Sequence, residues 1–280
     1  MIAVVGAGGQ LGLAVMEALA RCGLPAEGFT REMLDVSNRE SVKHCFAKKQ
    51  YDCVINCAAY TAVDASESHQ EEAFVVNGLG PQYLAEAGIP IVHISTDYVF
   101  DGEKTSPYDV DDAPAPLSVY GRSKRAGEEA LLAGNGSGMI IRTAWLYSAR
   151  SGTRNFLHTM RRLLSERETL GVVNDQRGTP TSAEDLAEAI AVLVKKGVHK
   201  APMQVLHFTN SGSTTWFGFA QGIQQHLGTS CAIRPITTAE YPMAARRPAN
   251  SVLSLNSIEA LGIHPRSWES ALADACAHLN

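Results

Sequence analysis

A tyrosine, Tyr120, and a lysine, Lys124, lie four residues apart in the second quarter of the chain. On a helix this spacing places both side chains on one face. A free tyrosine has a pKa of about 10, too high for ready proton exchange at neutral pH, but a nearby ammonium group lowers it. The pair therefore predicts that Tyr120 is a general acid/base whose pKa is lowered by Lys124.

A hydroxyl precedes this pair in the chain. Thr96 comes two residues after an apolar stretch, residues 89–94, that is typical of a buried strand. A hydroxyl at the carboxyl end of a strand is placed to donate to a carbonyl oxygen of a substrate. Thr96, Tyr120 and Lys124 together form the hydroxyl–tyrosine–lysine set of short-chain dehydrogenases/reductases, so we predict that these three residues are catalytic.

The first strand ends in a glycine-rich loop. The spacing G-x-G-x-x-G is absent because residue 11 is leucine, but Gly6, Gly9 and Gly12 fit G-x-x-G-x-x-G. In this arrangement the first glycine allows a tight turn, the second lets the backbone approach a pyrophosphate, and the third allows close packing of helix on strand. We therefore predict a dinucleotide site made by Gly6, Gly9, Gln10, Leu11 and Gly12.

The ends of the second and third expected strands indicate which nicotinamide nucleotide binds. An arginine after the second strand suits the 2′-phosphate of NADP, whereas an acidic residue suits the ribose of NAD. Arg31 occupies that place, next to Glu32, so NADPH is predicted and NADH is the alternative. Further predicted cofactor contacts are Asp35, Val36, Ala58, Ala59, Tyr60, Tyr120 and Lys124, the last through the ribose hydroxyls.

Apolar strands alternate with amphipathic helices through the first half of the chain. Such alternation predicts parallel βαβ units, and hence an α/β fold with a Rossmann-type doubly wound sheet and a smaller α/β substrate-binding lobe. We expect the nucleotide-binding domain at 1–147 and the lobe mainly at 148–280, with residues around 170–210 returning to the sheet. Expected strands are 2–5, 26–30, 53–56, 89–94, 139–143, 170–173, 204–208 and 231–236; expected helices are 11–21, 39–49, 71–87, 118–132, 155–164, 183–195, 215–226 and 267–279.

Composition excludes several classes of function. A net charge of −5 and a pI near 6.0 argue against a nucleic-acid-binding surface, which requires clustered positive charge. No apolar run approaches the roughly 20 residues that span a bilayer, and the first residues lack the basic region of a signal peptide. The six cysteines form no C-x-x-C pair. We therefore expect a cytoplasmic protein that binds neither nucleic acid nor membrane.

Seven segments make the resemblance to a known family specific. The chain resembles the dTDP-4-dehydrorhamnose reductases, a family of extended short-chain dehydrogenases/reductases. The resemblance implies NAD(P)H-dependent reduction of the 4-keto group of a nucleotide sugar, dTDP-4-dehydro-β-L-rhamnose, to dTDP-L-rhamnose. The matching segments are 9–12, 56–64, 95–102, 120–124, 142–147, 175–181 and 247–251.

The resemblance also implies a substrate site. Thr96 would orient the ketone, Asp97 and Trp145 would line the sugar pocket, and Arg247 would meet the diphosphate. Cys57 departs from the alanine usual in the family, and Ser254 stands where an aspartate is expected. Some members form dimers bridged by a metal ion. A homodimer is therefore left open here, but the metal ligands cannot be placed, so no metal is assigned.

Two alternatives to this function are left open. A nucleotide-sugar epimerase or 4,6-dehydratase shares the fold, although a dehydratase typically has Thr-Asp-Glu where this chain has tyrosine at Tyr98. A non-catalytic NADP-binding subunit, like the regulatory β subunit of methionine adenosyltransferase, would keep the glycine loop. Such a subunit has no need of the intact set Thr96, Tyr120 and Lys124.

Overall fold

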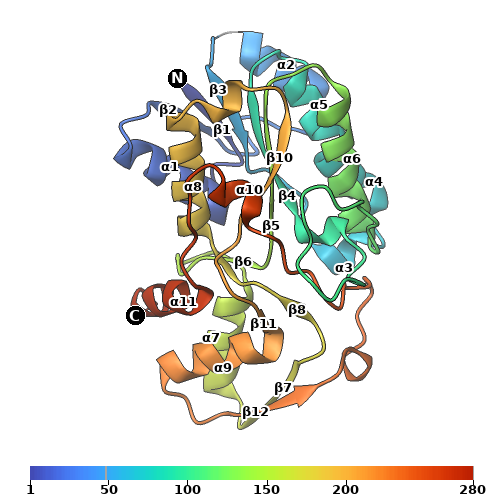
Figure 1. Ribbon diagram of the computed structural model, residues 1–280, viewed down its shortest axis with the longest axis vertical. Helices are drawn as coiled ribbons and strands as arrows, with labels where there is room; N and C mark the ends of the chain where they lie inside the picture. Colours follow the sequence, from blue (N-terminus) through green and yellow to red (C-terminus); the bar gives the residue numbers. More distant parts are fainter. Residues whose placement is uncertain (48, 280) are drawn as a thin grey trace.

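The computed structural model describes residues 1–47 and 49–279. Its centre is a six-stranded sheet in the order β10-β5-β4-β3-β1-β2, and every neighbouring pair is parallel (Figure 1). This sheet confirms the predicted Rossmann-type fold class. Its strands are β1 (Ile2–Val5), β2 (Ala26–Phe29), β3 (Cys53–Asn56), β4 (Ile91–Thr96), β5 (Gly138–Thr143) and β10 (Gln204–His207).

Alternate residues of each strand face two different helical layers. In β1, Ile2 and Val4 belong to one buried cluster, whereas Ala3 and Val5 belong to another. This period of two is what buries both faces of a parallel sheet. Helices α1 (Gln10–Arg21) and α8 (Ala183–Lys195) cover the first face, and the other face carries α2 (Arg39–Ala47), α5 (Gly80–Ala85) and α6 (Val119–Ala133).

The helix expected over 71–87 is interrupted. It consists of α4 (Gln70–Phe74), a π-helical turn at Val75–Leu79, and α5. Pro81 has no N–H to donate to the carbonyl of Asn77, so the regular ladder is broken at this point. Gly127 of α6 packs against that carbonyl so closely that a Cβ would lie 2.2 Å from it. The widened turn therefore brings α6 close to this layer.

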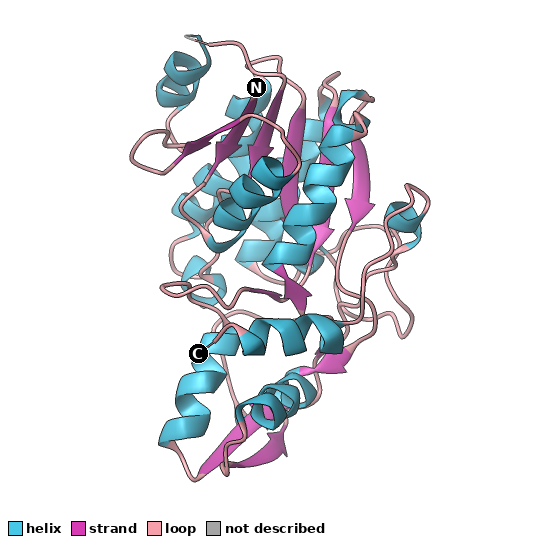
Figure 2. Cartoon of the chain, turned by 90° about the vertical axis from the view of Figure 1, so that its left-hand side faces the viewer, coloured by secondary structure: helices cyan, strands magenta, loops and turns pink. Residues whose placement is uncertain are grey.

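A second group of elements lies beyond the carboxyl ends of the strands (Figure 2). It contains α7 (Phe156–Glu166), α9 (Trp216–Leu227) and α11 (Trp268–Ala277), with β7 (Thr169–Val173) paired to β12 (Ala232–Ile236). Leu157, Phe219 and Trp268 are buried in its core. Two elements from the same half of the chain belong to the main sheet instead. Helix α8 packs on it, and β10 forms one of its edge strands. The domain boundaries proposed from the sequence stay a prediction.

Several short elements were not expected, because two to four residues are too few to show a hydrophobic period. The helix expected over 39–49 ends at Ala47, and Lys48 lies outside the described residues. No helix in the described ranges has the length and apolarity needed to cross a membrane. The unexpected elements are α3 (Val63–Ser66), β6 (Leu146–Tyr147), β8 (Arg177–Gly178), β9 (Thr181–Ser182), β11 (Thr214–Thr215) and α10 (Asn256–Glu259).

The connections reverse direction between β1 and β3. The chain runs from β1 to β2 at one edge and then returns past β1 to form β3 and β4 on its other side. Open parallel sheets bind ligands at such a switch point, outside the carboxyl ends of the strands. Gly6, Cys57 and Asp97 are the first residues after β1, β3 and β4, so the sequence motifs meet at this edge.

Candidate active site

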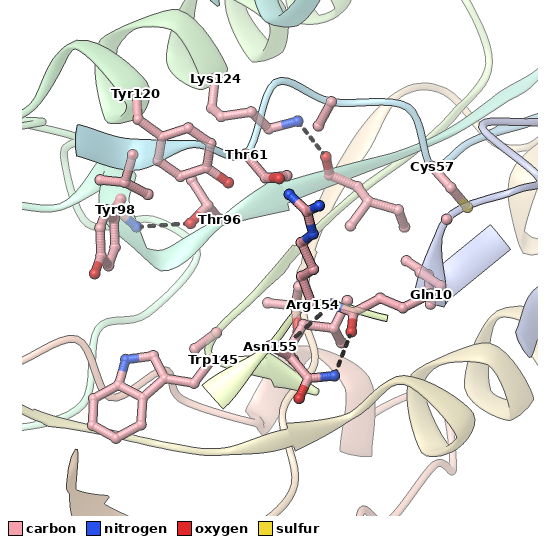
Figure 3. Close-up of a pocket in the computed structure, with 18 of the residues that line it drawn as sticks. Gln10, Cys57, Thr61, Thr96, Tyr98, Tyr120, Lys124, Trp145, Arg154 and Asn155 are labelled. Atoms are coloured by element: carbon pink, nitrogen blue, oxygen red, sulfur yellow. Dashed lines mark hydrogen bonds between the residues drawn. The ribbon is translucent and has the colours of Figure 1, made fainter. Parts of the chain in front are cut away.

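A cavity of about 600 Å³ lies at this edge of the sheet (Figure 3). The loop after β1, the ends of β3 and β4, the first turns of α6 and the segment after β5 all contribute to its wall. Nine of the residues predicted from the sequence line it: Gly9, Gln10, Leu11, Ala59, Thr96, Asp97, Tyr120, Lys124 and Trp145.

Helix α6 presents Tyr120 and Lys124 to the cavity. Its first turn is capped by Ser118, whose Oγ accepts a hydrogen bond from the N–H of Gly121 at 3.1 Å. Gly121 also brings the helix close to the segment after β4, because a Cβ there would lie 2.2 Å from the carbonyl oxygen of Tyr98. Both side chains enter the same cavity, as the four-residue spacing predicted.

The electrostatics of the pair differ from the sequence-based expectation. Burial raises the pKa of Tyr120 to about 12, and hydrogen bonding to Thr96 only partly opposes this. Burial also lowers the pKa of Lys124 to about 8, and its Nζ donates to the carbonyl oxygen of Ile94 at 2.6 Å. In the free protein, desolvation therefore outweighs the expected effect of Lys124 on the phenol. Tyr120 is protonated at neutral pH.

Thr96 and Asp97 form a hydrogen-bonded unit at the end of β4. The Thr96 hydroxyl donates to Oδ1 of Asp97 at 3.0 Å and accepts from the N–H of Tyr98 at 3.2 Å. Burial raises the pKa of Asp97 to about 7, against the opposing hydrogen bonds of Ser251 and Thr96. These bonds fix the orientation of the Thr96 side chain at the cavity wall.

The glycine loop has the geometry of a phosphate cradle. Gly6 has φ +76°, a left-handed conformation that favours glycine, and a Cβ on Gly12 would lie 2.2 Å from the carbonyl oxygen of Gly6. The turn is therefore tight, and α1 begins beside the cavity; the first N–H groups of a helix have no partner within the helix and favour an anion. Gly9, Gln10 and Leu11 line the cavity, while Gly6 and Gly12 shape the turn beneath it.

Most of the residues predicted to contact the adenosine half lie outside this cavity. The Arg31 side chain is 73% exposed, 4.0 Å from Glu72. The Asp35 carboxylate accepts hydrogen bonds from Ser37, and Val36 is buried in the core beside the sheet. Of the three predicted residues after β3, Ala59 lines the cavity but Ala58 and Tyr60 do not, and the backbone of Tyr60 is bound by the side chain of Asn77.

Trp145 is held in a strained conformation at the cavity wall. Its φ of 46° is rare for a large side chain, and its ring stacks on Trp216 at a centroid distance of 3.6 Å. Arg247 lies elsewhere, in a second cavity of about 1200 Å³ that Trp216 also lines. There its guanidinium pairs with both carboxylate oxygens of Asp64, at 2.9 and 2.5 Å.

Sequence reasoning missed a group of residues that the fold brings into the cavity. The Arg154 side chain extends into it toward Thr61 (Figure 3), and no ion pair within residues 1–47 and 49–279 involves Arg154. Asn155 donates to Oε1 of Gln10 at 3.1 Å and caps α7, tying the glycine loop to the second group of elements. Only the capping pattern at Asn155 was readable from the sequence, as the start of the helix expected over 155–164.

No cluster of three or more His, Cys, Asp or Glu side chains suited to a metal ion occurs within the described part of the chain. The cavity instead gathers hydroxyl, phenol and amine groups around a glycine-rich loop. Fold and site together define a Rossmann-type protein of the short-chain dehydrogenase/reductase class.

Comparison with known proteins makes the assignment specific. The family described as the RmlD substrate binding domain matches residues 1–280, and the chain belongs to this family. It is 42% identical over 277 residues to the spore coat polysaccharide biosynthesis protein SpsK of Bacillus subtilis (strain 168), covering 98% of this chain and 95% of that protein.

Two further relatives carry the name dTDP-4-dehydrorhamnose reductase. The protein from Mycobacterium tuberculosis (strain CDC 1551 / Oshkosh) is 40% identical over 286 residues, covering 99% of this chain and 92% of its own length. The crystal structure of the Bacillus anthracis str. Ames protein in complex with NADP is 36% identical. It superimposes with a TM-score of 0.90 over 98% of this chain and 97% of that one.

Proposed function

We propose that this protein reduces the 4-keto group of dTDP-4-dehydro-β-L-rhamnose with NADPH, giving dTDP-L-rhamnose. One observation carries the proposal: Thr96, Tyr120 and Lys124 come from two separate elements and line a single cavity with the glycine loop. The names of the relatives in this family support the same reaction and the same cofactor.

The glycine loop fits a dinucleotide. The tight turn at Gly6 and the close approach of Gly12 leave the amino end of α1 open toward the cavity, where N–H groups favour the pyrophosphate. Arg154 adds a positive charge to the same cavity. When bound, NADPH supplies the hydride that reduces the ketone.

The side chains of this protein supply the proton and the orientation. The Thr96 hydroxyl is held in place by the N–H of Tyr98, and when substrate binds it turns its proton from Asp97 to the ketone oxygen and polarises it. Tyr120 then gives its proton to the oxygen as negative charge develops there. Its pKa of about 12 keeps the donor form fully populated at neutral pH, and an alkoxide is basic enough to take the proton.

The substrate spans the two cavities, which share Trp216 as a common wall. Asp97 and Trp145 line the sugar side. The diphosphate lies on the side lined by the guanidinium groups of Arg167, Arg234, Arg246 and Arg247. Because Asp64 already pairs with Arg247, this arginine acts as a positioned donor rather than a free charge.

Replacing Arg31 with alanine is expected to lower the preference for NADPH over NADH about tenfold. The Arg31 side chain is exposed, its contact with Glu72 is at the 4.0 Å limit of an ion pair, and a hydrogen bond to the 2′-phosphate, a charged group, is worth about 1.5 kcal/mol or more. The measurement is kcat/KM with each nucleotide. Arg21→Ala, which replaces another exposed arginine, on α1, is the control. Equal efficiency of the native protein with both nucleotides would remove this role for Arg31.

The reaction is tested by mixing the purified protein with NADPH and a 4-keto sugar nucleotide and following the absorbance of the reduced nicotinamide. Parallel assays use dTDP-linked and UDP-linked 4-keto sugars. We expect consumption of one NADPH per product and a higher kcat/KM for the dTDP-linked sugar. Absence of NADPH consumption with both sugars would contradict the proposal. Cytoplasmic location and a homodimer also stay predictions, the second testable by sedimentation.

A further inference from the structure

Three buried polar side chains form a row that leads from the catalytic cavity, which Lys124 lines, back into the sheet. Asn56 of β3 and His93 of β4 are direct partners in the sheet register, and Lys124 of α6 lies over the same face. Asn56 is 1%, His93 0% and Lys124 2% exposed. Buried polar groups at this depth need partners, so the direction of each hydrogen bond in the row is constrained.

The backbone fixes the proton on the His93 ring. Oδ1 of Asn56 accepts from the N–H of Ala58 at 3.1 Å, which sets the orientation of the Asn56 amide. Its Nδ2 therefore faces Nδ1 of His93, 3.1 Å away, and donates to it. Burial, and then Lys124, lower the pKa of His93 well below its usual range, so the ring is neutral. With Nδ1 as an acceptor, the single ring proton is on Nε2.

This proton points at the lysine. Nε2 of His93 lies 3.4 Å from Nζ of Lys124. Nζ also donates to the carbonyl oxygen of Ile94, the bond drawn as a dashed line from Lys124 in Figure 3. An ammonium group has three donors and no acceptor. It therefore cannot accept the Nε2–H of His93, and two donors face each other. A neutral amine has a lone pair that accepts the Nε2–H. The row therefore favours the neutral form of Lys124.

We propose that His93 is a positioning residue for Lys124: Asn56 sets its tautomer, and its Nε2–H destabilises the ammonium form of the lysine. The proposal deepens the proposed reduction. Only its kinetic test, the pH dependence of kcat/KM, rests on that function. This effect of His93 makes the Tyr120–Lys124 pair lose its first proton close to physiological pH. The loss of that proton sets the alkaline limit of the reaction.

The other groups around Lys124 have the opposite effect or none. Glu128, one turn further along α6, stabilises the ammonium, although its carboxylate is already bound by Arg142 and Arg125. The Cys57 thiol after β3 would also stabilise it as a thiolate, but burial raises the pKa of Cys57 to about 12. Tyr120 is protonated, and Asp97 acts on Tyr120 rather than on the lysine. Besides burial itself, the positive charge of Arg154 in the same cavity opposes the ammonium, and His93 is the group within hydrogen-bond distance of Nζ that does so.

The tautomer is measured directly in the unmodified protein. A long-range proton–nitrogen NMR spectrum of the histidine rings distinguishes the two neutral tautomers and the cation, without any catalytic turnover. We expect His93 to carry its proton on Nε2 throughout the neutral pH range. A proton on Nδ1, or a charged ring, would overturn the proposal even if the protein reduces the sugar as proposed.

Asn56→Asp is expected to reverse the direction of the hydrogen bonds on both ring nitrogens of His93. A carboxylate accepts from Nδ1–H and still accepts from Ala58, which leaves Nε2 as an acceptor for the ammonium. We expect the titration of Lys124, followed by NMR of its ε-methylene group, to move up by about one pH unit. The alkaline limb of kcat/KM moves with it. If the Lys124 titration moves as expected but the protein shows no reductase activity, the proposed function alone is contradicted. An unchanged titration in an active enzyme would contradict this inference alone.

A double-variant cycle separates the row from a through-space effect of the new charge. In a His93→Phe background, Asn56→Asp should no longer raise the titration of Lys124, and persistence of the full shift would overturn the proposal. His207→Phe is the matched control. His207 is equally buried in the same sheet, but it faces Arg142, so its loss should leave the Lys124 titration in place.

Discussion

Tyr120→Phe is expected to lower kcat for ketone reduction by about 10²–10⁴-fold, the usual contribution of a positioned general acid. The substitution removes one oxygen from a partly buried ring and leaves the ring contacts with Tyr98 in place. The phenol is protonated at neutral pH, so the variant loses the proton donor rather than a charge. Binding of NADPH, measured by fluorescence titration, should stay within a few-fold of the native value.

Tyr51→Phe is the matched control for this loss. Tyr51 is buried, but it precedes β3 at the opposite end of the strands, where its hydroxyl donates to Glu27 at 2.7 Å. Its replacement should leave kcat near the native value. Native turnover by Tyr120→Phe would show that another group protonates the ketone oxygen.

Arg142→Met is expected to lower the free energy of unfolding by about 3–5 kcal/mol, because it leaves a buried carboxylate without its principal partner. Nε and Nη2 of Arg142 each donate to Glu128 at 2.8 Å, and the two side chains are 2% and 0% exposed. Burial alone would raise the pKa of Glu128, yet Arg142 keeps it below its usual value. Urea unfolding measures the loss.

An exposed arginine gives the contrast. Arg162→Met removes an i,i+4 pair with Glu166 on α7, where the side chains are 60% and 52% exposed, and should cost no more than about 0.5 kcal/mol. In the Arg142→Met background, Glu128→Gln should restore part of the stability because it removes the unpaired charge. A loss below about 1 kcal/mol for Arg142→Met would mean that Arg125 alone satisfies Glu128.

The parts of this fold that repeat a local pattern were predictable. The strands at 2–5 and 53–56 and the helix at 183–195 have the predicted bounds. The reason is that their burial follows a period of two or 3.6 residues that is visible in the sequence. The glycine loop and the spacing of Tyr120 and Lys124 were readable for the same reason, since each is a local motif on a single element.

The parts that depend on packing were not predictable. Arg154 and Trp216 reach the cavity only because the second group of elements folds over the strand ends. The pKa of Tyr120 depends on burial that no local pattern reports, and the sequence-based expectation took account only of the neighbouring charge. Likewise, the relation of His93 to Lys124 depends on the register of β3 against β4 and on the position of α6.

The most direct test of the reduction follows the hydride itself. The protein is incubated with the dTDP-linked 4-keto sugar and NADPH carrying deuterium at the transferable C4 position, and the product is analysed by NMR. We predict one deuterium at C4 of the sugar for each NADP⁺ formed. Conversion of the sugar without deuterium at C4 or consumption of NADPH, as in an epimerase, or no conversion, as in a binding subunit, would contradict the account.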